Sequence, residues 1–396
     1  MVVSEYLKCS ICEQDYRLRV GVGFDEYQKH YFDCVECEQP ITFALRAIAP
    51  NAHVETIENC LKTFTPTDEI VMNFHPNCSF DETDLHAPLA FPSIKYQQMI
   101  SPYMRLNPGK YQDIATQFDI PNAPGLWSKL KSILSLEAKG TSGKALKKVI
   151  KGYQLQRSKS KPDFHLETSY ELLFDFLDGV FYPRVNDTFD HVKQLIDSLH
   201  ADSKLDDFHA FYEANLKAEN LNRYLSVLSD YFKFRDHLGQ LAFHARVYDD
   251  DVDDRIVSSK EFEQIKLYYG QVYEALTSNF TVLACINNLS SGRKYDEFQR
   301  MTLNKYIKDV EKAKKHMPFE DKPEFKLFHE DLDSSLRNGS HHASIWRDGE
   351  KVVYRSGGTG AHRDIPYSRY IHISNKLTIS LAALFMAELY MCDKYS

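Results

Sequence analysis

An arginine and two histidines lie close together in the segment Arg337-Asn338-Gly339-Ser340-His341-His342. These residue types can act on a phosphodiester. A guanidinium holds phosphate oxygens through two parallel hydrogen bonds, and an imidazole gives or takes a proton near neutral pH. Such spacing also arises by chance on solvated helix surfaces, which is the alternative interpretation. The segment predicts a site for phosphate binding and proton transfer if neighbouring elements position it.

The elements around this segment are predicted from the pattern of apolar residues. Before Arg337, apolar residues recur every three or four positions, at Phe325, Phe328, Leu332 and Leu336. This spacing predicts a helix with one buried face, and Gly339-Ser340 is expected to loosen it. Residues 345–354 then predict a β-hairpin with a two-residue turn at Asp348-Gly349. A glycine-rich loop follows, and residues 377–391 predict a final apolar helix.

A helix ending in Arg-Asn-x-x-x-His, a small hairpin and a final apolar helix resemble the HEPN superfamily of ribonucleases. The resemblance covers residues 205–396 as architecture. The family motif is an arginine, a polar residue and then a histidine after four to six intervening positions, and it matches Arg337, Asn338 and His342. His341 leaves only three positions, although on a continuous helix it would share a face with Arg337. We therefore expect His342 to be catalytic, with His341 as a supporting candidate.

The resemblance implies a metal-independent endoribonuclease that cleaves tRNA or mRNA to 2′,3′-cyclic phosphate and 5′-hydroxyl ends. It implies that His342 transfers the proton, Arg337 stabilises the developing charge, and Asn338 orients the histidine or contacts the phosphate. Members of the family usually form homodimers and often act in bacterial toxin–antitoxin or phage-defence systems, so an antitoxin or regulatory partner is expected. Two alternatives stay open: a non-catalytic RNA- or nucleotide-binding HEPN module, and a zinc-ribbon adaptor.

Four cysteines form a second candidate site in two C-x-x-C motifs, at Cys9, Cys12, Cys34 and Cys37. Two such motifs can supply the four thiolates of a tetrahedral Zn²⁺ site. A closed site of this kind has no open coordination position, so the zinc is expected to be structural. Disulfides or a redox pair are the alternatives, and both fit poorly with the cytoplasmic location expected here.

Residues 139–161 contain eight lysines or arginines and no acidic residue. This run favours contact with an RNA backbone through Lys144, Lys147, Lys148 and Lys151, with Tyr153 available to stack on a base. The alternative is a flexible solvated linker. A separate acidic turn holds five aspartates within residues 249–254. It lacks the glycine and ligand spacing of a calcium loop, so a solvated loop is the preferred interpretation.

The chain has 396 residues, of which 43% are hydrophobic and 26% charged, and a net charge of −8. The length predicts two or three domains, and the acidic balance argues against nonspecific coating of nucleic acid. No signal peptide opens the sequence, and residues 377–391 are too short for a membrane span of about twenty residues. We therefore expect a cytoplasmic protein without a membrane segment.

The predicted fold class is mainly α, with a C-terminal HEPN-like helical bundle and a small β-hairpin after an N-terminal zinc ribbon and α/β region. The expected domains are a zinc ribbon (1–45), a small mixed α/β region (46–138), a basic linker (139–162) and a helical domain (163–396). Within the mixed region, residues 54–64 predict a short helix and residues 69–74 a strand. Bundle helices are expected over 218–247, 259–290, 297–316, 323–341 and 370–392.

Overall fold

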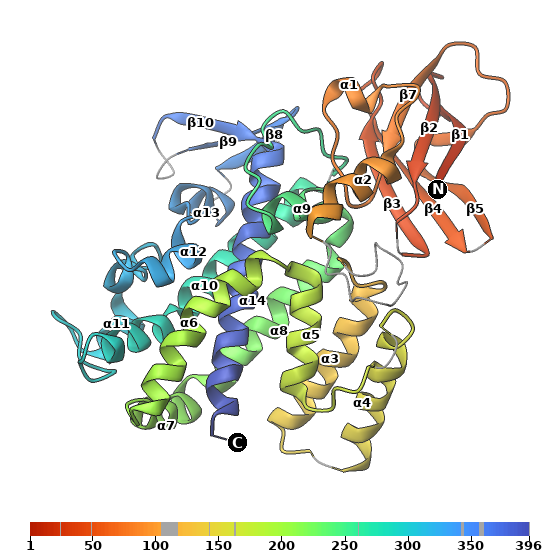
Figure 1. Ribbon diagram of the computed structural model, residues 1–396. Helices are drawn as coiled ribbons and strands as arrows, with labels where there is room; N and C mark the ends of the chain where they lie inside the picture. Colours follow the sequence, from red (N-terminus) through yellow and green to blue (C-terminus); the bar gives the residue numbers. More distant parts are fainter. Residues whose placement is uncertain are drawn as a thin grey trace.

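The computed structural model is mainly α, as predicted, with a smaller β-rich part at the N-terminus (Figure 1). It describes residues 1–23, 25–48, 50–103, 118–141, 143–161, 164–259, 261–341, 344–355 and 360–395. None of the described helices is both long enough and apolar enough to span a bilayer.

The N-terminal part consists of two sheets packed on a shared core. One sheet has the strand order β6-β1-β2-β7 and the other β3-β4-β5, and the pairs are antiparallel except for the parallel pair of β2 and β7. The strands are β1 (Val2–Cys9), β2 (Asp15–Gly21), β3 (Tyr27–Asp33), β4 (Pro40–Ile48), β5 (Asn51–Glu58), β6 (Cys60–Lys62) and β7 (Glu69–Phe74). The aromatic side chains of Phe32, Phe43 and Phe74 contact one another in the core.

The two predictions for this region have different outcomes. The strand predicted over residues 69–74 is confirmed as β7. The helix predicted over residues 54–64 is wrong, because this stretch forms most of β5 and all of β6. The β-branched residues Val54 and Thr56 pair with β4, and Val54 is buried. Cross-strand packing of this kind outweighs weak local helix propensity.

Short helices connect the sheets to the helical part: α1 (Glu82–Leu85), α2 (Pro92–Ile100) and the 3-10 turn η1 (Ser101–Tyr103). The helical part then contains α3 (Ala123–Ala138), α4 (Lys144–Arg157), α5 (Ser169–Phe181), α6 (Arg184–Ala201), α7 (Asp206–Asn215), α8 (Lys217–Lys233), α9 (Arg235–Arg246) and α10 (Phe262–Ser290). After α10 come α11 (Leu303–Asp309), the 3-10 turns η3 (Lys312–Lys314), η4 (Met317–Phe319) and η5 (Pro323–Phe325), α12 (Lys326–His329), α13 (Ser334–His341) and α14 (Tyr367–Asp393).

Helix α14 lies at the centre of the helical part (Figure 1). It contacts α5, α6, α8, α9 and α10, and its side chains are buried almost continuously from Tyr367 to Met391. Most of these buried residues are apolar, as expected for an enclosed helix, and buried polar ones such as Asn375 and Glu388 are hydrogen-bonded. The apolar helix predicted over residues 377–391 is confirmed and is longer at both ends.

The predicted basic linker (139–162) has regular structure instead. Residues 144–157 form α4, which packs against α3. Tyr153 of α4 and Trp127 of α3 belong to the same apolar core as α14. The predicted boundary between residues 45 and 46 does not separate two cores. Strands β6 and β7, which follow it, lie in the same sheet as β1 and β2.

The segment before the candidate catalytic residues is not one helix. Residues 323–341 form η5, α12 and α13, and the chain leaves helical geometry between His329 and Ser334. A third sheet, with the order β10-β9-β8, follows α13. Its strands are β8 (Ile345–Asp348), β9 (Lys351–Arg355) and β10 (His362–Pro366). The predicted hairpin is confirmed, but Asp348 pairs with Lys351, so its turn is Gly349-Glu350.

Candidate functional site

Helix α13 carries the candidate catalytic motif and is capped by Asp333. The carboxylate Oδ1 of Asp333 accepts hydrogen bonds from the backbone N–H groups of Ser335 (2.7 Å) and Leu336 (3.0 Å). The Tyr269 hydroxyl of α10 donates to the carbonyl oxygen of Asp333 (3.1 Å). A side-chain acceptor at this position satisfies amides that the first turn of a helix leaves free. The start of α13 is therefore fixed locally and also tied to α10.

Helix α13 continues through Gly339 and Ser340, so the predicted loosening at these residues is wrong. A Cβ atom at position 339 would lie 3.2 Å from the Cβ of Ile345 in β8. The glycine is therefore explained by close packing of the helix on the hairpin. Ser340 Oγ donates to the Leu336 carbonyl (2.9 Å) and lies 3.2 Å from the Tyr370 hydroxyl of α14.

Arg337 is held by an acidic residue of α10. Its Nε donates to Glu274 Oε1 (2.6 Å), its Nη2 contacts the same oxygen, and its Nη1 donates to Asn338 Oδ1 (2.8 Å). A guanidinium has five N–H donors. Three contacts among the described residues leave two donors, one on each terminal nitrogen, for a ligand. The Arg337 side chain is 28% exposed, so a ligand can reach it.

A cavity of about 330 Å³ lies beside Arg337. It is lined by Tyr273, Glu311, Lys312, Ala313, Ser334, Arg337 and Asn338. Lys312 and Glu311 come from η3 and the residue before it, so the cavity lies between this turn, α10 and α13. Glu311 pairs with Lys314 (2.8 Å), which compensates its charge. The wall of the cavity thus offers a guanidinium, an ammonium and an amide to an anionic ligand.

The structure does not describe where the side chains of the two candidate histidines lie relative to this cavity. His341 is the last residue of α13, but its side chain lies outside the described part of the chain, as does the whole of His342. The structure brings Arg337, Asn338 and the cavity together. The catalytic role of either histidine stays a prediction. Because α13 is continuous, the position of His341 follows that of Arg337 by four residues along one helix.

The structure brings together the sulfur atoms of the four predicted cysteine ligands. The pairs Cys9–Cys37 and Cys12–Cys34 have Sγ–Sγ distances of 3.8 and 3.4 Å, and all four atoms lie within 4.8 Å of one another. Four sulfurs at about 2.3 Å from a tetrahedral ion lie about 3.8 Å apart. The group could therefore hold a metal ion, and a set of four thiolates is compatible with zinc.

The two cysteine turns have the same backbone design. Each turn connects two strands of one sheet, and the residue after its second cysteine, Glu13 or Glu38, has a positive φ. The Tyr16 hydroxyl donates to Cys34 Sγ (3.0 Å). Burial raises the pKa of the Cys34 thiol, but hydrogen bonds from Tyr16 and from backbone amides outweigh it and bring the pKa to about 7. This favours the thiolate at Cys34, which is the form that binds metals, whereas the pKa values of the neighbouring Cys12 and Cys37 thiols are raised.

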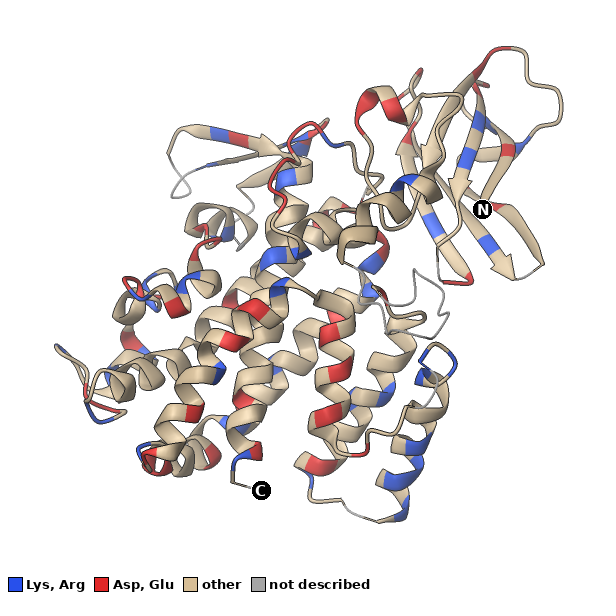
Figure 2. Cartoon of the chain, in the orientation of Figure 1, with Lys and Arg blue, Asp and Glu red and all other residues tan. Residues whose placement is uncertain are grey.

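The four predicted RNA-binding lysines are exposed on α4. Lys144, Lys147, Lys148 and Lys151 follow a helical spacing of three and four, and Figure 2 shows the resulting run of basic residues along this helix. The proposed stacking role of Tyr153 is wrong, because its side chain is 0% exposed. Its hydroxyl instead donates to the Leu172 carbonyl (3.4 Å).

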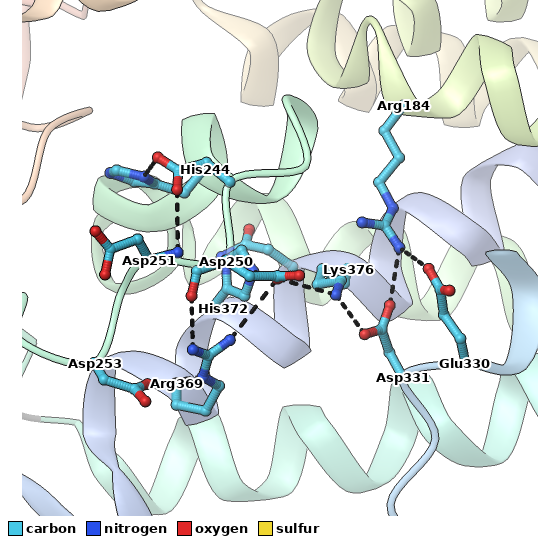
Figure 3. Close-up of polar contacts among 12 residues, drawn as sticks. Arg184, His244, Asp250, Asp251, Asp253, Glu330, Asp331, Arg369, His372 and Lys376 are labelled. Atoms are coloured by element: carbon cyan, nitrogen blue, oxygen red, sulfur yellow. Dashed lines mark hydrogen bonds and ion pairs between the residues drawn. The ribbon is translucent and has the colours of Figure 1, made fainter.

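The aspartate-rich turn is bound to cationic side chains (Figure 3). Asp250 Oδ1 lies 2.9 Å from His372 Nε2 and 3.2 Å from Lys376 Nζ, and Asp253 Oδ1 accepts from Arg369 Nε (2.8 Å). Lys376 continues the network to Asp331, which also pairs with Arg184. Burial lowers the pKa of His372 to about 4. The turn thus fastens α14 to its neighbours through ion pairs with Lys376 and Arg369 and a hydrogen bond with the neutral His372.

Two residues of the Arg337 site were not predicted. Glu274 lies within an apolar helical pattern, and Lys312 lies in a short polar segment between helices. Neither belongs to a recognisable motif, so the sequence carried no signal for them. Comparisons with protein-family models, with curated protein sequences and with solved structures found no significant match. The functional assignment therefore depends on the geometry of the site itself.

Proposed function

We propose that this chain is a HEPN-like, metal-independent endoribonuclease. The observation that carries the proposal is the Arg337 guanidinium, which Glu274 holds beside a cavity that Lys312 and Asn338 also line. A fixed guanidinium with two available donors suits a phosphate group that gains negative charge during a reaction. His341, the last residue of α13, and His342, the next residue in the sequence, are the candidate groups for proton transfer.

The reaction needs no group other than these side chains and the RNA. The ribose 2′-oxygen attacks the adjacent phosphorus as its proton leaves, and the bond from phosphorus to the 5′-oxygen breaks as that oxygen gains a proton. This yields a 2′,3′-cyclic phosphate and a 5′-hydroxyl. His342, or His341, takes or gives one of these protons, and solvent water exchanges the other. Acid–base help of this kind is typically worth 10²–10⁴-fold in rate. Arg337 stabilises the charge on the phosphorane, and Asn338 helps to hold Arg337 through its Oδ1.

RNA is proposed to lie also along α4. Its four exposed lysines have no acidic neighbour within residues 139–161, so their charges add along one stretch of the surface. Contacts of this type are independent of base sequence and weaken as salt increases. Lys144, Lys147, Lys148 and Lys151 would then hold the backbone, while the Arg337 site acts on one phosphodiester.

The four-cysteine group is proposed to hold a structural Zn²⁺ in a module that resembles a zinc ribbon. All four ligand positions are taken by protein sulfur, so the ion would stabilise the two cysteine turns and would take no part in RNA cleavage. The further expectations are a homodimer, an antitoxin or regulatory partner, and a toxin or phage-defence role in the cytoplasm. They follow from the HEPN resemblance and are part of the same proposal.

The deciding experiment incubates the protein with total tRNA and a labelled single-stranded RNA in magnesium-free buffer with EDTA. Metal content is measured before and after, so that loss of the structural ion is detected. Wild type is compared with the His341→Ala, His342→Ala and Arg337→Ala variants. His53→Ala is the matched control, because the His53 side chain is 53% exposed on β5, outside the site. The same RNA with 2′-deoxyribose throughout is the substrate control.

Cyclic-phosphate ends that require the 2′-hydroxyl, Arg337 and one of the two histidines are the expected result. RNA binding that depends on Arg337 without any product would favour the non-catalytic HEPN module. RNA affinity that is unchanged in Arg337→Ala, again without product, would favour an adaptor. Both of these outcomes contradict the proposed nuclease.

A further inference from the structure

Lys312 is anchored on the same face of α10 as Arg337. Its Nζ donates to Ser278 Oγ (2.5 Å), and Ser278 Oγ donates in turn to the Glu274 carbonyl (2.6 Å). Glu274 holds Arg337 through its carboxylate. Ser278 and Glu274 are four residues apart, about 6 Å along the helix axis, so the two cations are held by residues on successive turns of one helix.

The turn that carries Lys312 is itself firmly held. Lys315, three residues later, is 1% exposed and donates its Nζ to the carbonyls of Ile307 (3.0 Å) and Tyr306. The Tyr306 hydroxyl donates back to the Lys315 carbonyl. Burial and then the charge of Lys312 lower the pKa of Lys315 to about 8. Lys312 therefore projects from a rigid support and not from a free loop.

The charges around the cavity favour an anion between the two cations. Burial lowers the pKa of Lys312, and the nearby charges of Arg337 and Arg223 lower it further, whereas Glu274 and Glu219 act against this. Glu219 pairs with Arg223, and Glu311 pairs with Lys314. Two cations that repel each other on one cavity wall are both stabilised electrostatically when a phosphate lies between them.

We propose that Lys312 is a second phosphate-binding residue of the Arg337 site, so that the cavity grips an RNA backbone through one guanidinium and one ammonium. This inference rests on the proposed function of that site. The two groups have different roles. A guanidinium fixes the orientation of one phosphate, whereas an ammonium is a point charge that contacts any phosphate oxygen within reach. Lys312 thus supplies affinity, and Arg337 supplies orientation and charge stabilisation.

The test measures RNA binding without cleavage. A fluorescent single-stranded RNA with 2′-O-methyl groups throughout has no free nucleophile, so fluorescence anisotropy reports affinity alone. Wild type, Lys312→Met and Lys312→Arg are titrated at several salt concentrations. Lys308→Met is the matched control, because Lys308 of α11 is exposed, lies four residues before Lys312 and does not line the cavity. Thermal unfolding confirms that each variant is folded.

Lys312→Met is expected to weaken binding about tenfold, as for the loss of one charged hydrogen bond. It should also make the slope of log K against log salt shallower by about 0.7, the value for one phosphate contact on a single strand. Lys312→Arg should keep the wild-type slope, and Lys308→Met should change neither quantity. An unchanged slope in Lys312→Met, or no RNA binding by the wild type, would overturn the inference. Binding that depends on Lys312 but yields no cleavage of natural RNA would overturn the nuclease proposal alone.

Discussion

Glu274 determines the orientation of the Arg337 guanidinium. It contacts Nε and Nη2 together and leaves the outer edge of the group toward the cavity. A partly exposed ion pair of this kind contributes little to stability, with a typical value below about 1 kcal/mol. In the proposed nuclease, this ion pair is more important for orienting Arg337 than for stability, because misplacing a catalytic group lowers the reaction rate far more than the stability of the fold.

Glu274→Gln is therefore expected to lower the RNA cleavage rate by about 10- to 100-fold while the protein stays folded. The amide keeps one acceptor for Arg337 but loses the charge that fixes it. RNA affinity should be unchanged or tighter, because one negative charge beside the cavity is removed. Single-turnover cleavage and anisotropy separate the two effects. Glu263→Gln, an exposed position on the same helix, is the control, and an equal rate loss in both variants would contradict the assignment.

Glu388 is a second informative side chain, in the core of the helical part. It is 1% exposed, and it accepts hydrogen bonds from the Tyr224 hydroxyl (2.6 Å), the Tyr212 hydroxyl (2.8 Å) and Asn220 Nδ2 (3.1 Å). Burial raises its pKa to about 7, although these hydrogen bonds act in the opposite direction. The folded protein thus binds a proton here at pH values where the unfolded chain has released it.

A carboxyl group whose pKa is raised in the folded state contributes its full stabilisation at low pH. This contribution is lost as the pH rises from about 4.5 to about 7. Glu388→Gln removes the titration. The stability of the variant relative to wild type should therefore improve over this range, with a slope of at most about 1.4 kcal/mol per pH unit, and stay constant above it. Denaturant unfolding at pH 5, 6, 7 and 8 measures this difference. Parallel curves for the two proteins would show that Glu388 is ionised throughout.

Single residues differ in how well the sequence predicted them. Arg337, Asn338 and the four cysteines stand in local motifs, and the structure places the first two on one cavity and the cysteines in one cluster. Glu274 and Lys312 reach the site through tertiary contacts with residues up to 63 positions away. No local pattern encodes such a partner. Tyr153 was misinterpreted because its basic neighbours suggested exposure, whereas its own face of α4 is buried.

Among the elements, α13 depends on close contact with the hairpin at Gly339. A Cβ at this position would lie 3.2 Å from Ile345 Cβ, and a larger side chain would force the helix and β8 apart. Gly339→Leu is expected to destabilise the protein by about 1–3 kcal/mol through overpacking. It should also reduce cleavage, because Arg337 moves with the helix. Thermal unfolding and single-turnover rates measure the two effects, and an unchanged melting temperature would contradict the packing argument.

Long, strongly patterned elements were predictable, and short interrupted ones were not. Helix α14 and strand β7 follow clear apolar patterns, and the hairpin follows its turn signal. The split between α12 and α13 was missed because Leu332 continues the helical spacing across a break capped by Asp333. Residues 218–247 likewise form two helices, α8 and α9, that meet at Phe234. A change of helix direction leaves little trace in the spacing of apolar residues.

At the scale of the whole molecule, the cysteine cluster lies between the two N-terminal sheets, since each sheet supplies one cysteine turn, and a metal ion bound there would fasten the sheets to each other. Cys12→Ser is expected to abolish binding of one metal ion per chain and to lower the melting temperature. Loss of a structural zinc can remove on the order of 10 kcal/mol from a small module. Elemental analysis and thermal unfolding provide the measurements.

Cys60→Ser is the control for this experiment. Cys60 is buried in the same sheet, next to Cys9, but lies outside the cluster. Its replacement should leave the metal content at the wild-type value. Equal metal content in wild type and Cys12→Ser would show that the cluster does not bind the ion.

The arrangement of domains was the least predictable feature. The N-terminal core includes Phe243 of α9, and Gln240 of the same helix donates to the His75 carbonyl just after β7 (3.3 Å), so the β-rich and helical parts are joined by buried contacts. Strand β7 pairs in parallel with β2 across more than fifty residues. Strand pairing between residues so far apart in sequence depends on the tertiary fold, and local sequence patterns do not predict it.

The position of α14 in the chain has a consequence for synthesis. Helices α5, α6, α8, α9 and α10 leave the ribosome before the helix on which all of them pack. Helix α13 also precedes it, and its Ser340 lies against Tyr370 of α14. The apolar faces of these helices therefore remain without their common partner until α14 emerges. Assembly of the helical core is therefore expected to follow the synthesis of residues 367–393.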